Sequence, residues 1–124
     1  MIGATVEMAQ ERGILIMKTR EIIARREFTI GKDGKRQLEA LVYAPVEDGA
    51  HDFRCEYEIR EDGAVTTASQ DYGVDSMQAL ILALRKLGAD IITSEHVMKK
   101  ELHWNDQNED LGLVLPKSLS DLQT

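Results

Sequence analysis

The sequence predicts a two-layer α+β fold, in which an antiparallel β-meander of four to six strands packs against one long or broken helix. Apolar and polar residues alternate with a period of two in residues 38–44 and 53–59, as in half-buried strands. Asp-Gly pairs, which are typical of hairpin turns, begin at Asp33, Asp48 and Asp62. After Asp75 the period changes to about 3.6 residues, which indicates an amphipathic helix.

Length and composition are those of one globular domain. The chain has 124 residues, of which 43% are hydrophobic and 30% charged. We expect the domain itself to span residues 20–116, followed by a loose tail at 117–124. Residues 1–19 are expected to be an N-terminal extension, with a short helix from Ala4 to Arg12 as one form of it.

Cysteine count and hydropathy indicate the compartment. A single cysteine excludes an intrachain disulfide, which favours a reducing cytoplasm. No apolar run reaches the roughly 20 residues that cross a bilayer, so we expect no membrane association. Glu7, Glu11 and Arg12 lie where a signal peptide would be apolar.

The strands are predicted in chain order. Arg20 to Ile30 ends in apolar residues and is followed by the first Asp-Gly turn, and Pro45 stops the next strand after Ala44. The third strand alternates most clearly. Its core face is predicted to carry Phe53, Cys55, Tyr57 and Ile59, and its other face Asp52, Arg54, Glu56, Glu58 and Arg60. The last Asp-Gly turn leads into residues 64–72.

The predicted helix has one apolar stripe, made of Leu80, Leu84, Leu87, Ile91 and Met98. Gly88 either ends a twelve-residue helix or lies inside a longer one at a cost of about 1 kcal/mol. The stripe stays in phase beyond Gly88, which favours one long helix. Leu102 to Trp104 is a candidate for a short strand, and Pro116 stops a second apolar segment, Leu111 to Leu115.

The stretch Tyr72-Gly73-Val74-Asp75-Ser76-Met77-Gln78-Ala79-Leu80 predicts how the helix begins. Asp75 as N-cap accepts from the N–H of Gln78, and Gln78 reaches back to the N–H of Asp75, which forms a capping box. Val74 and Ala79 lie at the positions of a hydrophobic staple. The alternative is an anion site at the helix N-terminus, but Asp71 and Asp75 would repel an anion.

Together with other segments, this stretch resembles a family of small bacterial proteins of unknown function. The other segments are Ile23-Ala24-Arg25-Arg26-Glu27-Phe28, Phe53-Arg54-Cys55-Glu56-Tyr57, and Trp104 followed by Leu111-Gly112-Leu113. The resemblance covers residues 20 to 116. It implies a bacterial, cytosolic, stand-alone domain, and it supplies no catalytic residues.

No catalytic residue, metal site or cofactor site is predicted. Cys55 is expected in the core, where a thiol is inert. His96 and His103 are seven residues apart, too far for shared metal coordination on one helix, and are interpreted as surface histidines. Asp106 to Asp110 lacks the ligand pattern of a calcium loop.

Charge is distributed unevenly within the net charge of −7. Residues 17–36 hold seven Lys/Arg against three acids, whereas residues 37–75 hold ten acids against two arginines. An acidic middle repels phosphate backbones, so nucleic-acid binding is not favoured. It would require one exposed basic face, made of Arg25, Arg26, Lys35 and Arg36.

Apolar residues outside the predicted core suggest an interface, and the candidate residues are Leu41, Tyr43, Glu56, Glu58, Ile81, Leu82 and Ile92. The favoured hypothesis is a non-enzymatic, self-associating interaction domain. In its specific version, an immunity- or antitoxin-like protein uses Glu56, Glu58, Glu61 and Asp62 to mask a basic partner protein. The alternative is a small-molecule binder or enzyme with a pocket between helix and sheet, near Tyr57, Tyr72 or Trp104.

Overall fold

A computed structural model describes residues 4–11, 14–49 and 52–115, with side chains from Arg20 onward. The strands are β1 (Ala4–Glu11), β2 (Ile14–Ile30), β3 (Arg36–Tyr43), β4 (Val46–Asp48), β5 (Asp52–Glu61), β6 (Ala64–Gly73) and β7 (Leu102–His103). The helices are α1 (Ser76–Ile92) and α2 (Glu95–Met98). The expected tail, residues 117–124, lies outside the described residues.

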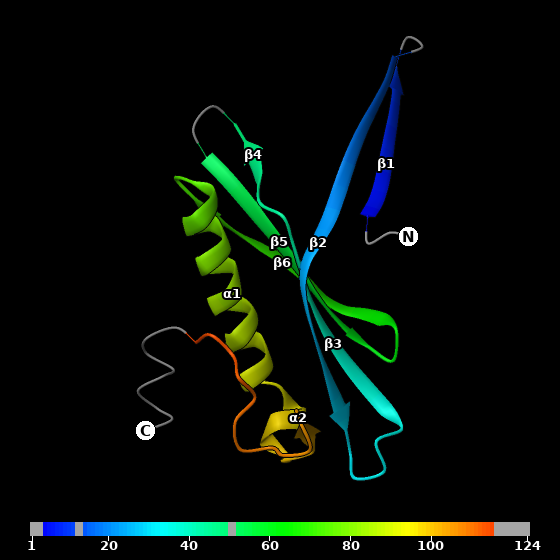
Figure 1. Cartoon of the computed structure of the whole chain (residues 1–124), viewed down its shortest axis with the longest axis vertical. Helices are drawn as coiled ribbons and strands as arrows, with labels where there is room; N and C mark the ends of the chain where they lie inside the picture. Colours follow the sequence, from blue (N-terminus) through cyan, green and yellow to red (C-terminus); the bar gives the residue numbers. More distant parts are fainter. Residues whose placement is uncertain (1–3, 12–13, 50–51, 116–124) are drawn as a thin grey trace.

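The strands form one antiparallel sheet, and α1 packs on one face of it (Figure 1). β2, β3, β5 and β6 are neighbours in that order, while β4 continues beside β5 where β3 ends. α1 lies mainly over β6 and β5. The predicted two-layer α+β fold is therefore confirmed.

β2 is shared between two hairpins. Its first half, Ile14 to Glu21, pairs with β1, and its second half, Ile22 to Ile30, pairs with β3 across an irregularity at Ile22. The β1–β2 hairpin projects away from the two layers (Figure 1). A strand over Ala4–Glu11 thus replaces the helix considered for Ala4 to Arg12, and Arg12 lies outside the described residues. β2 runs through the expected domain boundary at residue 20.

The core lies between α1 and the predicted row on β5. Cys55, Tyr57 and Ile59 are buried, Phe53 is half-buried, and all four face the helix as their alternation predicts. The helix contributes a buried row spaced by four residues, made of Ala79, Ala83, Leu87 and Ile91. At the predicted Asp62-Gly63 turn both residues have positive φ, as a two-residue hairpin loop requires.

The beginning of α1 differs in detail from the predicted capping box. The Asp75 carboxylate accepts from the N–H of Gln78 at 2.7 Å, as expected. The Gln78 side chain instead accepts from the N–H of Val74, one residue before the cap. Val74 is exposed and forms no staple. Gly73 packs so closely under α1 that a Cβ there would collide with the backbone nitrogen of Ala79.

The end of α1 corrects the prediction of one long helix. α1 continues through Gly88 but ends at Ile92, and α2 begins three residues later. The Thr93 and Ser94 hydroxyls donate to carbonyls of the last turn of α1, which competes with continuation of the helix. Met98 is exposed as a result and does not extend the apolar stripe.

Candidate functional site

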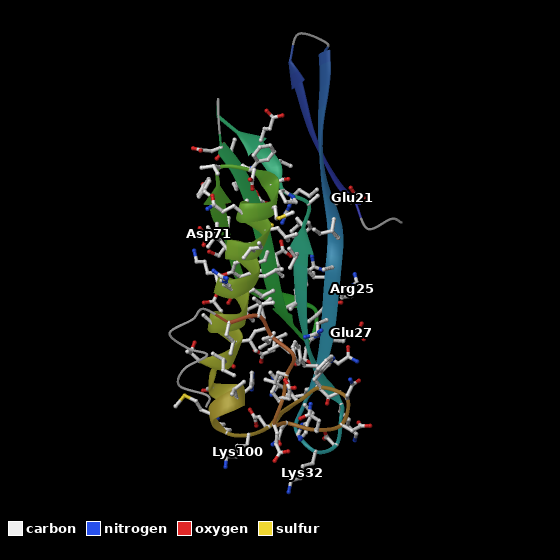
Figure 2. All side chains as sticks on the ribbon, turned by 60° about the vertical axis from the view of Figure 1, so that its left-hand side comes forward. Glu21, Arg25, Glu27, Lys32, Asp71 and Lys100 are labelled. Atoms are coloured by element: carbon white, nitrogen blue, oxygen red, sulfur yellow. The ribbon has the colours of Figure 1, made fainter. Side chains whose placement is uncertain are left out.

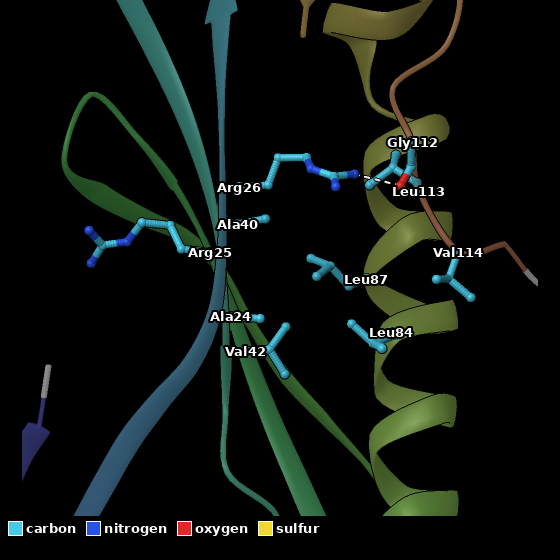
Figure 3. A pocket seen from close by; sticks show the side chains of 10 residues that line it. All are labelled: Ala24, Arg25, Arg26, Ala40, Val42, Leu84, Leu87, Gly112, Leu113 and Val114. Carbon is cyan, nitrogen blue, oxygen red and sulfur yellow. Dashed lines mark hydrogen bonds between the residues drawn. The ribbon is translucent and has the colours of Figure 1, made fainter. Parts of the chain in front are cut away.

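An apolar groove separates α1 from the β2–β3 half of the sheet (Figure 3). It exists because α1 lies over β5 and β6, so the helix covers only part of the sheet. The groove encloses a cavity of about 150 Å³. Its lining residues are Ala24, Arg25, Arg26, Ala40, Val42, Leu84, Leu87, Gly112, Leu113 and Val114.

One end of the groove is closed by residues 111–115, which run from β2 to α1. Gly112 lies against Trp104 and Arg26, and a Cβ there would collide with both side chains. At the helix, a Cβ on Gly88 would collide with the carbonyl oxygen of Val114. A glycine therefore suits position 88 inside α1, because residues 111–115 cross the helix there and leave no room for a side chain.

Arg26 lies at this closed end and points towards α1 (Figure 3). Its guanidinium lies 4.0 Å from the centroid of the Trp104 ring, which it faces. Its Nη1 donates to the carbonyl oxygens of Leu111 and Gly112. No carboxylate lies within 4.0 Å of it among the residues whose side chains are described, so its positive charge is not neutralised by an ion pair.

Beside the groove, β2 has an open edge. Within the described part of the chain, its outer edge pairs with β1 up to Glu21 and with β7 from Thr29 onward. Between them, Ile22 and residues 24–28 pair only with β3, on the other edge, and Ile23 lies at the irregularity in that pairing. Figure 2 shows Glu21, Arg25 and Glu27 along β2, on the side away from α1. The open stretch is seven residues, or roughly 23 Å of strand.

Strand geometry identifies the backbone groups on this edge. The N–H of Gly31 donates to Glu101, the residue preceding β7, at 2.8 Å. Because backbone groups alternate between the two edges of an antiparallel strand, residues 25 and 27 direct their N–H and C=O to the same side. These groups have no backbone partner among the described residues, so they are available to an added strand.

The opposite face of the sheet also buries apolar side chains, and here the prediction that Leu41 and Tyr43 are partly exposed is wrong. Leu41 is 0% and Tyr43 2% exposed. The reason is a cover of long charged side chains. The Arg20 guanidinium lies 3.9 Å from the centroid of the Tyr43 ring, and Arg25, Arg60 and Glu58 surround the two residues.

The carboxylates of this cover are ion-paired. Glu58 accepts from Arg60 at 2.8 Å and from Arg20 at 3.1 Å. Burial would raise the pKa of Glu58, but hydrogen bonds from Arg60, Arg20 and Tyr43 outweigh burial and lower it. Glu56 pairs with Arg20 and Arg54. The predicted acidic face is therefore largely neutralised within the chain.

The other predicted interface residues lie on α1. Ile81 is exposed, whereas Leu82 and Ile92 are half-buried. Ile92 borders a second cavity, of about 180 Å³, together with Val97 and Leu111. The structure does not bring these three residues together with Glu56 and Glu58, which lie on the far face of the sheet.

The buried nucleophiles are held in unreactive forms. Cys55 donates to the carbonyl of Tyr43 at 3.3 Å, and burial together with the charge of Glu56 raises the pKa of its thiol to about 11. The Tyr57 hydroxyl donates to Asp90 on α1, and burial and this bond raise the pKa of Tyr57. Both side chains therefore stay protonated at neutral pH.

His96 is buried, not a surface histidine as predicted. Its Nδ1 lies 2.6 Å from Glu101 and its Nε2 3.1 Å from Glu61, which also binds Arg36. Burial would lower the pKa of His96, but the two carboxylates outweigh burial and raise it. His96, Glu61 and Asp90 line an open polar cavity of about 370 Å³. The described residues include no group of three or more side chains placed to hold a metal ion.

A basic nucleic-acid face does not form as its hypothesis requires. Arg25 and Arg26 point to opposite sides of the sheet (Figure 3). Arg36 is bound to Glu61 and Asp62. The four basic side chains therefore do not share one exposed face.

The alternative hypothesis placed a pocket between helix and sheet near Tyr57, Tyr72 or Trp104, but the lining residues of this groove and the open edge of β2 were not predicted from the sequence. The groove depends on which strands the helix covers, and the open edge depends on where β1 and β7 stop. No local pattern specifies either of these. The signal that was present is Gly112, which lies between apolar residues after Trp104, since such a glycine marks a close backbone approach.

The family comparison covers the elements that form the groove. No helix among the described residues is long and apolar enough to span a membrane. No curated protein and no solved structure matches the chain. A family model described as Domain of unknown function (DUF6968) matches residues 24–115, which include most of the second half of β2, α1 and the closing segment. The chain belongs to this uncharacterised family.

Proposed function

We propose that this chain is a protein-interaction domain that binds an extended segment of a partner protein along the open edge of β2. The observation that carries the proposal is the outer edge of residues 22–28, which pairs with no strand in the described part of the chain and lies next to an apolar groove. An added strand gains backbone hydrogen bonds from the edge, and its alternate side chains gain burial in the groove.

The edge suits a short segment better than a second copy of the chain. β1 and β7 end the open stretch at both sides, so about seven residues of a partner fit. In an antiparallel β2–β2 pair, strands of 17 residues would continue past these limits and meet β7. Self-association through this edge is therefore disfavoured.

Exposed apolar residues on the elements that border the groove support the same proposal. Ile23 on β2, Ile81 on α1 and Val114 on the closing segment are 45%, 38% and 46% exposed. These residues come from three elements that border the groove. Exposed apolar residues around a strand edge are typical of an interaction surface.

The narrower, immunity- or antitoxin-like hypothesis receives less support. It needs Glu56, Glu58, Glu61 and Asp62 to attract a basic partner. All four carboxylates already bind arginines of the same chain. A basic partner would have to displace these ion pairs, so electrostatic masking is a weaker basis for binding than the open edge.

The test is selection of a displayed random-peptide library on the full-length protein. Selected peptides should have apolar residues at every second position. They should lose binding to Glu27→Pro, which lacks the edge N–H, and keep it with Glu27→Ala, which retains it. Circular dichroism checks that both variants fold.

Amide hydrogen exchange provides the second measurement on the wild-type protein. The amides of residues 25 and 27 should exchange fast in the free protein and at least about tenfold slower with a selected peptide bound. Peptides that bind Glu27→Pro as well as Glu27→Ala, or no enrichment over the bare support, would overturn the proposal.

A further inference from the structure

We propose that Arg26 is a carboxylate-binding residue, so that the groove takes a carboxylate attached to an apolar chain. The inference rests on the proposed function in using the same groove, and it adds the chemistry of the ligand. Apolar residues line most of the groove, and one cationic side chain lies at its closed end.

The charge of Arg26 distinguishes it from the other arginines on the sheet. Arg20, Arg25, Arg36, Arg54 and Arg60 each bind at least one carboxylate. Arg26 binds only two carbonyl oxygens, both through Nη1, among the residues that the structure describes. A half-buried guanidinium without a counter-ion is stabilised by an anion that brings its own charge.

The contacts around Arg26 fix its guanidinium in an orientation that suits carboxylate binding. The Trp104 ring and the carbonyls of Leu111 and Gly112 hold the guanidinium in place. Its Nε and Nη2 donate to no acceptor in the described part of the chain. Two N–H groups in a fixed plane match the two oxygens of a carboxylate. Ala24, Val42 and Leu84 provide apolar contact for the attached chain.

A matched pair of small probes tests the inference on the full-length, isotope-labelled protein. Octanoate and octanamide have the same chain and differ in charge. Octanoate should shift the Arg26 Nε–Hε signal and the Val42 and Leu84 methyl signals, and it should bind about tenfold or more tightly than octanamide. Arg26→Gln should bring this ratio close to one, and Arg26→Lys, which keeps the charge, should retain part of it.

Two peptide arms distinguish the sources of the carboxylate. Acetyl-Val-Leu with a free carboxyl end presents a C-terminal carboxylate, and acetyl-Glu-Leu amide presents a side-chain carboxylate. The arm that shifts the Arg26 Nε–Hε signal identifies the source.

Equal affinity of octanoate and octanamide for the wild type would overturn the inference. So would a wild-type Arg26 Nε–Hε signal that octanoate leaves unmoved. Neither result affects the peptide selection and the Glu27→Pro comparison, which test the edge. If Arg26 only holds the closing segment in place, its substitution changes stability but leaves no preference for the acid over the amide.

Discussion

Both faces of the sheet bury apolar side chains, but different parts of the chain cover them. On one face α1 covers Tyr57 and its neighbours with apolar side chains. On the other, arginine and glutamate side chains cover Leu41 and Tyr43, and no helix packs there among the described residues. Packing of the first kind depends on shape, whereas the second also depends on charge, pH and salt.

The largest effects should come from shortening one buried side chain on each face of the sheet. Ile91→Ala, on the helix face, should lower the free energy of unfolding by about 3 kcal/mol, because the packed layers cannot close the cavity. Leu41→Ala should cost about 2 kcal/mol, because long charged side chains can move into the space. Urea unfolding measures both. A larger loss for Leu41→Ala would mean that the charged cover is the more rigid one.

The charged cover should also respond to pH through Glu58. Glu58→Gln should cost about 1.5 kcal/mol at neutral pH, since it weakens hydrogen bonds with two arginines. The pKa of Glu58 is lowered on folding, so its contribution is present above the unfolded pKa of roughly 4.3 and is lost as pH falls through the folded pKa.

The measurement is urea unfolding of wild type and variant from pH 7 to pH 3. The difference between them should shrink towards acid pH and also in 1 M salt, where the Debye length is only about 3 Å. Glu47→Gln is the control, because Glu47 is exposed. A difference that stays constant with pH would show that Glu58 acts through packing.

The contrast between the two faces also explains which parts of the fold could be predicted from the sequence. The core row of β5 could be predicted because alternation is a local property of a strand. The burial of Leu41 could not, since its neighbours on the adjacent strands are Arg25 and Glu58, which lie 16 and 17 residues away in the chain. Similarly, the heptad spacing of Ile91 and Met98 favoured one helix, but the hydroxyls of Thr93 and Ser94 end it between them.

The candidate site was harder to predict than the fold for the same reason. The groove depends on the position of α1 across the strands, and the open edge depends on where β1 and β7 stop. The exposure of Ile81 could be anticipated from the helical wheel alone. The role of Arg26 needs the tertiary contact with Trp104, which lies 78 residues away in the chain.

The smallest effect should come from substitution of His96, which lies between Glu101 and Glu61 at the border between the two layers. Its pKa is raised on folding because Glu101 and Glu61 outweigh burial. Its contribution is therefore fully present below the unfolded pKa of roughly 6.5 and is lost as pH rises through the folded pKa. His96→Gln should thus lower the free energy of unfolding by up to about 1 kcal/mol at pH 6. The loss should be smaller at pH 9, where the charge of His96 no longer contributes.

The ring-proton shift of His96, followed by NMR against pH, checks this sign directly. Glu101→Gln removes one of the two carboxylates and should bring the titration midpoint closer to the usual value, which a loss of packing alone would not do. A midpoint below the usual value in the wild type would mean that burial outweighs the two carboxylates. In that case apolar packing, as on the helix face, and not the two ion pairs would keep His96 in place.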